Sequence, residues 1–165
     1  MMRRARPGGR LDRAVAIATV FLILGGATRV MAADACDLMV ATLAAEEGVQ
    51  FERRTEGGTI HLKHPLARSL SIDCGPFARG PNLFATWSGA YPPAEFYTFL
   101  GRAAAVVVKK GAGPVVAGAK RCQGEALKSK DGQAEIHTGG LEFDCQAFTR
   151  NGGSSSFTIG PDQPS

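Results

Sequence analysis

Apolar and polar residues alternate along seven short stretches of the chain: 49–53, 59–63, 70–74, 83–87, 134–137, 141–148 and 155–159. This period of two is typical of strands that have one side in a hydrophobic core and the other in water. In the first stretch the alternation places Val49, Phe51 and Arg53 on one side. Turn-forming residues such as Gly57 and Pro65 separate the stretches. We therefore predict an antiparallel sheet of about six to seven strands.

Apolar residues recur at helical spacing in three other stretches, 34–47, 93–110 and 114–128. Asp34 can cap the first of these helices, Gly48 can end it, and Pro93 fits the first turn of the second. The Val106–Val108 run within the second helix is also compatible with a strand. Together the patterns predict an α+β fold in which three helices pack on one face of the sheet.

The N-terminus has the three parts of a secretory signal peptide. Five arginines lie between residues 3 and 13, an apolar stretch covers 14–27, and Val30-Met31-Ala32 meets the small-x-small rule for cleavage before Ala33. We therefore expect a signal peptide at 1–32, one domain at 33–160 and a flexible tail at 161–165. The export route would leave the protein in the periplasm or secreted. The alternative is an uncleaved inner-membrane anchor, although the apolar stretch is shorter than the ~20 residues that span a bilayer.

Removal of this segment changes the charge of the protein. The whole chain has a formal net charge of +4. Residues 1–32 contain six of the 19 Lys and Arg and one of the 15 Asp and Glu, so 13 basic and 14 acidic residues remain. Binding to nucleic acid needs a surplus of cations that neutralise phosphates. We therefore expect no nucleic-acid partner, and contact with a membrane only through the signal segment if it is uncleaved.

All four cysteines, Cys36, Cys74, Cys122 and Cys145, follow the expected cleavage point. An even number of cysteines in an exported chain indicates two disulfides, for which three pairings are possible. The spacings contain no Cys-x-x-Cys, which argues against a redox-active pair or a zinc site. The cysteines are thus expected to brace the fold.

An internal similarity favours one of these pairings. Residues 70–77 and 141–148 both have the pattern L-x-[IF]-D-C-x-x-F. Each is preceded by a strand with Ile-His and, farther back, by a helix with a cysteine, and each is followed by a strand that begins at a phenylalanine, Phe84 or Phe157. If these are two repeated helix-plus-strands units, pairing within each unit joins Cys36 to Cys74 and Cys122 to Cys145.

Four polar residues form the weaker of two candidate sites: His61, His137, Asp73 and Asp144. The two histidines are equivalent in the repeat, as are the two aspartates, and a His–carboxylate pair can do acid–base work if the groups meet. Histidines on the solvent side of a sheet are the simpler interpretation. No nucleophile motif accompanies them, and we predict no metal and no cofactor.

The densest aromatic neighbourhood in the chain contains Trp87, Tyr91 and Tyr97. Tryptophan and tyrosine are enriched where proteins bind partners, although most large aromatics are structural. These residues are therefore a candidate surface for a protein or small ligand.

The function expected from the sequence is an exported, non-catalytic module that binds an unknown protein or small ligand. The first alternative is an envelope hydrolase that uses a histidine with Asp73 or Asp144. The second is a structural envelope protein tethered by its N-terminus.

Overall fold

The computed structural model describes residues 34–75 and 80–162, which belong to one unit, Ala32–Ser165. In these residues the elements are α1 (Ala35–Glu47), β1 (Gln50–Arg54), β2 (Thr59–His64), β3 (Ala67–Asp73), β4 (Asn82–Trp87), α2 (Ala94–Val108), α3 (Ala112–Ala126), β5 (Gln133–Thr138), β6 (Leu141–Phe148) and β7 (Ser154–Pro161). The expected signal peptide, 1–32, lies outside the described residues.

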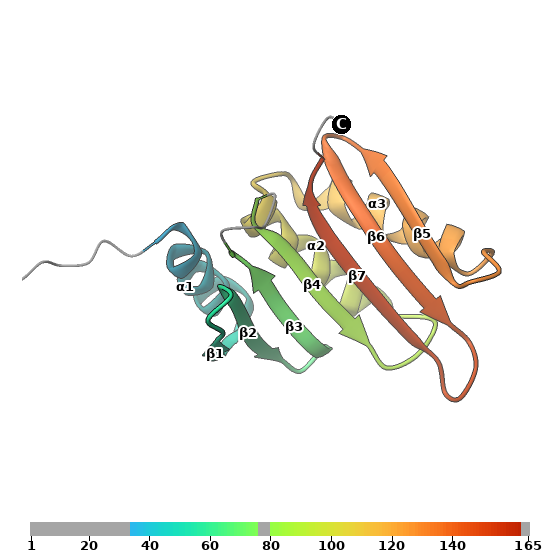
Figure 1. Cartoon of the computed structure of the whole chain (residues 1–165), viewed down its shortest axis with the longest axis horizontal. Helices are drawn as coiled ribbons and strands as arrows, with labels where there is room; N and C mark the ends of the chain where they lie inside the picture. The colour runs from blue at the N-terminus through green and yellow to red at the C-terminus, as the bar shows by residue number, and fades with distance from the viewer. Residues whose placement is uncertain (1–33, 76–79, 163–165) are drawn as a thin grey trace, which may run out of the picture. The chain divides into compact units, whose positions relative to one another are not determined.

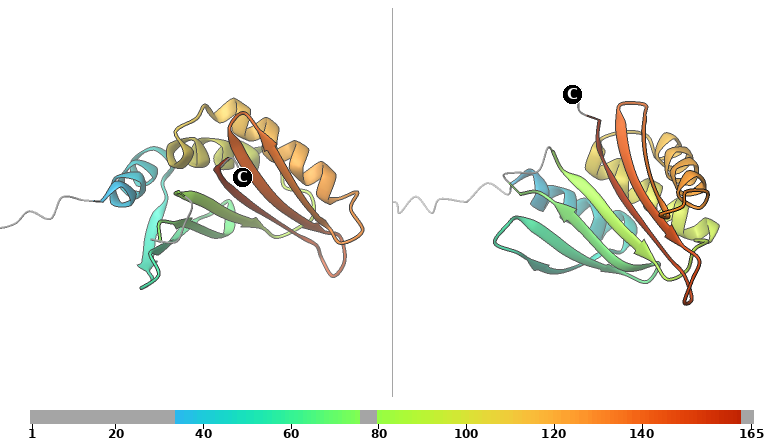
Figure 2. Two further views of the ribbon diagram at one scale, coloured as in Figure 1. Left: turned by 45° about the horizontal axis from the view of Figure 1, so that its top comes forward. Right: turned by 45° about the vertical axis from the view of Figure 1, so that its right-hand side comes forward.

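The seven strands form one antiparallel sheet in the order β1-β2-β3-β4-β7-β6-β5 (Figure 1). The first four strands and the last three each follow chain order, and they meet where β4 pairs with β7. All three helices lie on one face of the sheet (Figure 2). The predicted α+β class, strand number and helix placement are confirmed.

Packing between the helices and one face of the sheet forms the core. In β6 every second residue is buried, and these residues are Leu141, Phe143, Cys145 and Ala147. The largest fully buried side chains come from both layers and include Phe96 and Phe99 of α2 as well as Phe157 of β7. Each contributes roughly 1.5–3 kcal/mol by leaving water. Among residues 34–75 and 80–162, no helix covers the other face of the sheet.

Two disulfides attach helices to the sheet. Cys36 in α1 is bonded to Cys74, directly after β3, with a Cα–Cα distance of 6.4 Å. Cys122 in α3 is bonded to Cys145 in β6, with a Cα–Cα distance of 5.9 Å. The predicted pairing is confirmed, and it is typical of a protein that folds in an oxidising, extracytoplasmic environment.

A row of buried apolar residues crosses six strands with twofold symmetry. Each member pairs with the next, and the row consists of Ile60, Ile72, Leu83, Ile159, Phe143 and Ile136. Its centre is the Leu83–Ile159 pair between β4 and β7. The strands one step from this centre are β3 and β6, and the next are β2 and β5. The sequence repeat matches the same strands with each other. The register of the sheet therefore supports the two-unit interpretation.

The register of β4 and β7 differs from the one that the sequence repeat predicted. The sequence aligned Phe84 with Phe157, but the twofold relation equates Leu83 with Ile159 instead. Phe84 lies on the face without helices, whereas Phe157 is fully buried. A single phenylalanine was a poor marker of register because a shift of one residue moves a side chain to the opposite face.

A β-bulge corrects the predicted faces of β1. The register shifts between Phe51 and Arg53, so Arg54 takes the helix-facing position that alternation gave to Arg53. Arg54 then reaches α1, where its Nη1 lies 2.8 Å from Asp34 Oδ2. The expected cap is present as well, since Asp34 Oδ1 accepts from the Asp37 N–H.

The boundaries of three other elements differ from the expected ones. Lys109 adopts a left-handed conformation with φ 54° and ends α2 at Val108, while Gly111 serves as the N-cap of α3. Val106–Val108 is helical rather than extended. β7 continues to Pro161, and the N–H of Asp162 donates to the Gly140 carbonyl at 3.1 Å, so the chain is still hydrogen-bonded where the flexible tail was expected to begin.

Candidate functional site

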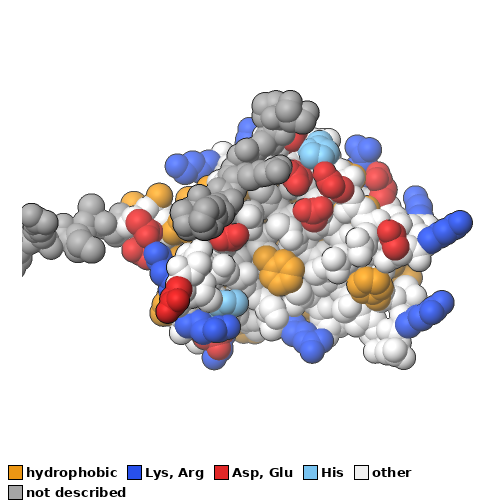
Figure 3. Space-filling view, in the orientation of Figure 1, with side chains coloured by type: hydrophobic (Ala, Val, Ile, Leu, Met, Phe, Trp, Pro, Cys, Tyr) orange, Lys and Arg blue, Asp and Glu red, His pale blue; other side chains and the backbone are white. Residues whose placement is uncertain are grey.

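The face of the sheet without helices, which we call the open face, is mainly polar (Figure 3). A hollow of about 540 Å³ lies over β3, β4, β7 and β6, and we call it the central hollow. Hydroxyl and amide side chains line it, among them Ser69, Thr86, Thr158 and Gln146, and the phenyl rings of Phe84 and Phe148 flank them. Its volume falls within the ~300–1,000 Å³ typical of ligand pockets.

Thr86 in the central hollow has an unsatisfied hydroxyl. Its Oγ1 is buried and has no hydrogen-bond partner within the described part of the chain. Leaving such a group unpaired costs about 1–3 kcal/mol, and most buried polar atoms in proteins are paired. A rotation of the Thr86 side chain toward the hollow would let a bound molecule supply the missing partner.

The central hollow continues toward the edge of the sheet formed by β1. A second hollow, of about 600 Å³, lies over β1, β2 and β3 and shares Arg68 and Ser69 with the first. It adds His61, Lys63 and Glu52, and Lys63 Nζ lies 3.0 Å from Glu52 Oε1. The opposite end, at β5 and β6, carries Glu135, Glu142 and Asp144, and Figure 3 shows acidic side chains gathered there near a histidine.

The three aromatic residues singled out in the sequence do not form one surface. Trp87 is part-buried, packs 5.7 Å from the Phe96 ring and lines the central hollow. Tyr91 is 73 % exposed, but Tyr97 is only 6 % exposed and belongs to the core. Burial raises the pKa of Tyr97 to about 12. Its inclusion in a binding surface was therefore wrong.

Tyr97 instead takes part in a buried polar network that fixes the loop between β4 and α2. Its hydroxyl bonds to Oε1 of Gln123 in α3, and Nε2 of Gln123 donates to the Ala90 carbonyl. The Ser155 hydroxyl donates to the carbonyls of Gly89 and Ala90, at 2.9 and 3.1 Å. These bonds hold the loop against the end of β7 that borders the central hollow.

The sheet separates the polar residues that the sequence proposed as a site. His61 lies in β2 and His137 in β5, with four strands between them, which corresponds to about 24 Å at the usual strand spacing. Asp73 and Asp144 are three strand steps apart, about 14 Å. Asp73 accepts from the N–H of Gly75 at 3.0 Å and so serves the turn after β3. The two units are related by a twofold axis, but it keeps these pairs apart.

His137 instead bonds to carboxylates that the sequence did not single out. Its Nδ1 lies 2.8 Å from Asp162 Oδ1 and its Nε2 lies 2.9 Å from Glu135 Oε1. The hydrogen bonds to Asp162 and Glu135 raise the pKa of His137. Both ring nitrogens are thus occupied by carboxylates, and the described residues give His137 no serine, threonine or cysteine as a hydrogen-bond partner. This is not the arrangement of a hydrolytic triad.

Asp144 lies near this cluster without bonding to His137. It pairs across the strands with Glu135, and burial, followed by the charge of Glu135, raises its pKa. Glu142 in turn pairs with His137 across the tight Gly139-Gly140 turn. A two-residue Gly-Gly hairpin fixes its own register, so this turn was the sequence signal that could have placed Glu142 opposite His137.

Comparison with protein-family models, curated proteins and solved structures finds no match for the chain. In the part of the chain that the structure describes, no helix is long and apolar enough to cross a membrane. The open face itself therefore provides the evidence for a function.

Proposed function

We propose that the chain is an exported, non-catalytic binding module and that the central hollow binds a neutral polyhydroxylated ligand such as an oligosaccharide. The observation that carries this proposal is the lining of the hollow. Hydroxyl and amide groups can each donate and accept hydrogen bonds, which suits a ligand rich in hydroxyls. The phenyl rings of Phe84 and Phe148 offer apolar surface to the faces of sugar rings.

The charge of the molecule supports a neutral ligand. The mature chain is close to neutral overall, and the central hollow contains one cation, Arg68, and one carboxylate, Asp144, among the residues that line it. A strongly anionic or cationic ligand would meet a group of its own sign there. A partner bound mainly through ion pairs is therefore less favoured than one bound through hydrogen bonds and ring contacts.

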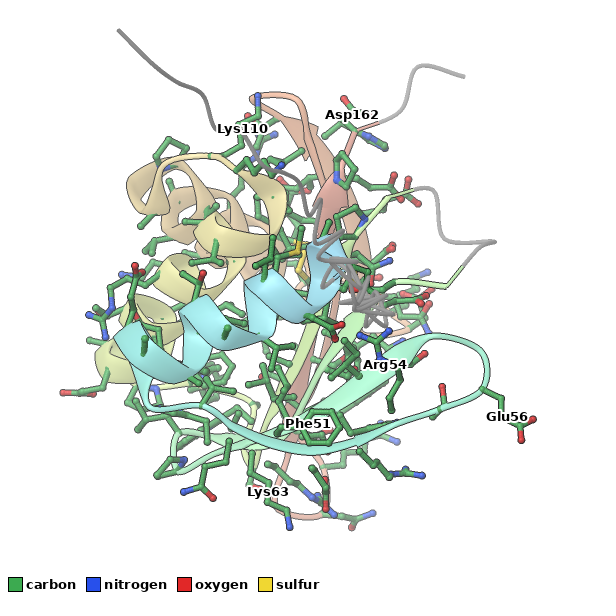
Figure 4. The ribbon with its side chains drawn as sticks, turned by 90° about the vertical axis from the view of Figure 1, so that its left-hand side faces the viewer. Phe51, Arg54, Glu56, Lys63, Lys110 and Asp162 are labelled. Carbon is green, nitrogen blue, oxygen red and sulfur yellow. A yellow bond between two sulfur atoms is a disulfide. The ribbon has the colours of Figure 1, made fainter. Side chains whose placement is uncertain are left out.

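Titration with neutral oligosaccharides tests the binding site. We expect a tetramer of N-acetylglucosamine or of maltose-type glucose to shift the amide resonances of β4 and β7 in the ¹⁵N-labelled mature protein. Phe84→Ala should weaken this binding about 10-fold, which corresponds to about 1.4 kcal/mol. Phe51→Ala is the matched control, because Phe51 is also an exposed ring, 58 % accessible, but it is in β1 (Figure 4) and does not line the central hollow. Equal weakening by both variants, or no shifts with either sugar, would contradict the proposal.

Export is tested by the mass of the chain recovered from a bacterial envelope. We expect an N-terminus at Ala33 and a gain of four hydrogen atoms on reduction, two for each disulfide. A chain that retains residues 1–32 in the membrane fraction would favour the anchored alternative.

A further inference from the structure

Three residues from separate segments bring metal-ligating atoms together at the acidic end of the open face. One ligand atom each from His137, Glu142 and Asp162 lies within 4.8 Å of the other two. His137 and Glu142 are fixed by their cross-strand pairing in the β5–β6 hairpin. Asp162 is held against the same hairpin because its backbone N–H donates to the Gly140 carbonyl. Figure 4 shows Asp162 at this end of the sheet.

We propose that His137, Glu142 and Asp162 bind a divalent transition-metal ion of the Zn²⁺ type. One imidazole and two carboxylates are ligands that Zn²⁺ accepts, with bonds of about 2.0–2.2 Å. Tetrahedral coordination at that bond length separates ligand atoms by about 3.3 Å. Ligand atoms now up to 4.8 Å apart would therefore move together by roughly 1.5 Å. His137 is exposed and the two carboxylates are partly exposed, so rotation about their χ angles can achieve this.

Glu135 completes the arrangement from the other side of the ring. Histidine ligands of metals usually donate their second N–H to a carboxylate or carbonyl, which fixes the tautomer and the ring orientation. With the metal on Nδ1, beside Asp162, the Nε2–H of His137 donates to Glu135, whose Oε1 is 2.9 Å away. The ion would replace the proton on Nδ1, and Asp162 would pass from accepting a hydrogen bond to ligating the ion.

The local charge also favours a cation. Four carboxylates surround one imidazole here, namely those of Glu135, Glu142, Asp144 and Asp162. Glu142 and Asp144 also line a small hollow of about 150 Å³, together with Thr158 and Gly160 of β7. One positive charge lies close to the hairpin turn, because Lys110 Nζ is 3.4 Å from the position that a Cβ on Gly140 would occupy, and the four carboxylates outnumber it.

The first unit of the fold provides an internal control. His61 occupies the position in β2 that His137 occupies in β5, but Ser71 faces it across the strands where Glu142 faces His137. The residue two positions earlier is Thr59 instead of Glu135. The positions that hold Glu135 and Glu142 beside His137 are therefore occupied by the hydroxyl residues Thr59 and Ser71 beside His61. The carboxylates of the second unit are not required for the architecture and call for a separate reason.

Titration with Zn²⁺ tests the site. The mature, oxidised protein is first treated with a chelator, which removes any bound metal, and Zn²⁺ is then added. Calorimetry should show one equivalent of Zn²⁺ bound, and the imidazole ¹⁵N resonances of His137 should shift while those of His61 stay in place. His137→Gln should reduce the affinity more than 100-fold. Glu135→Gln should reduce it by about 10- to 100-fold, the usual effect of losing an outer-shell partner. Ca²⁺ should bind far more weakly, because it selects oxygen ligands.

His61→Gln is the matched control and should leave Zn²⁺ affinity unchanged. Both histidines are on the open face, so neither substitution should unfold the protein, and circular dichroism of each variant verifies this. Equal effects of the two substitutions, or no movement of the His137 resonances at saturating Zn²⁺, would overturn the proposal and leave the cluster as ion pairs only. The metal proposal is independent of sugar binding, because Phe84 is not one of the proposed ligands. Phe84→Ala should therefore leave the Zn²⁺ affinity unchanged.

Discussion

Gly118 in α3 lies directly against the Phe143 ring of the sheet. A Cβ at this position would lie 2.3, 2.6 and 2.9 Å from the Cζ, Cε2 and Cε1 atoms of Phe143, a fully buried ring in β6. Gly124 in the same helix has nothing within 4 Å of its Cβ position. Alanine in place of glycine stabilises a helix by about 1 kcal/mol, and this gain applies to both positions. At Gly118 an overpacking cost of about 1–3 kcal/mol opposes it.

We therefore expect Gly124→Ala to raise the free energy of unfolding by about 1 kcal/mol and Gly118→Ala to leave it unchanged or lower it by up to about 2 kcal/mol. The difference between the two variants, about 1–3 kcal/mol, isolates the contact with Phe143 because the helix propensity cancels. Urea unfolding of the oxidised protein, followed by circular dichroism, measures both. Equal stabilisation by the two substitutions would refute the close contact between α3 and β6.

The disulfides and His64 give two further predictions. By loop entropy, alanine at both Cys36 and Cys74, 38 residues apart, should cost about 3.9 kcal/mol. Alanine at both Cys122 and Cys145, which are 23 residues apart, should cost about 3.4 kcal/mol by loop entropy and about 0.8 kcal/mol more for each fully buried sulfur. Urea unfolding should therefore show that loss of the Cys122–Cys145 disulfide is the more destabilising. The reverse order would contradict this reasoning. The His64 ring stacks on the Phe99 ring with 3.8 Å between their centroids, and its Nδ1 accepts from the Leu66 N–H. Burial lowers the pKa of His64 below the unfolded value of 6.5. The contribution of His64 to stability is therefore present above pH 6.5 and is lost as the pH falls toward the folded pKa. Unfolding midpoints at pH 7.5 and 5.0 should differ less in His64→Asn than in the wild type, and an unchanged difference would exclude His64 as the cause.

Alternation and the internal repeat predicted most of the fold, because both reflect local packing. A strand such as 141–148 has to bury every second residue against the helices, and the pattern therefore remains visible in the sequence. The disulfide pairing followed from the repeat because each unit offers one helix cysteine and one strand cysteine that face the same layer. Spacing alone left three pairings open.

Most of the candidate site depends on contacts between segments distant in sequence, which periodicity does not show. Asp162 reaches His137 only because β7 continues to Pro161 beside the β5–β6 hairpin. Tyr97 is buried because α2 packs against α3 as well as the sheet, so that its hydroxyl meets Gln123. The bulge that turns Arg54 toward α1 adds a single residue that alternation does not reveal.

The two faces of the sheet differ in how closely the two units correspond. On the covered face the apolar row is matched across the Leu83–Ile159 pair, because both halves pack against helices and a change of volume there is costly. On the open face no such packing applies, and the units differ: Ser71 faces His61, whereas Glu142 faces His137. Residues that packing does not constrain can change to suit a ligand. The acidic end of the open face is therefore where we expect the second unit to have acquired a role that the first unit lacks.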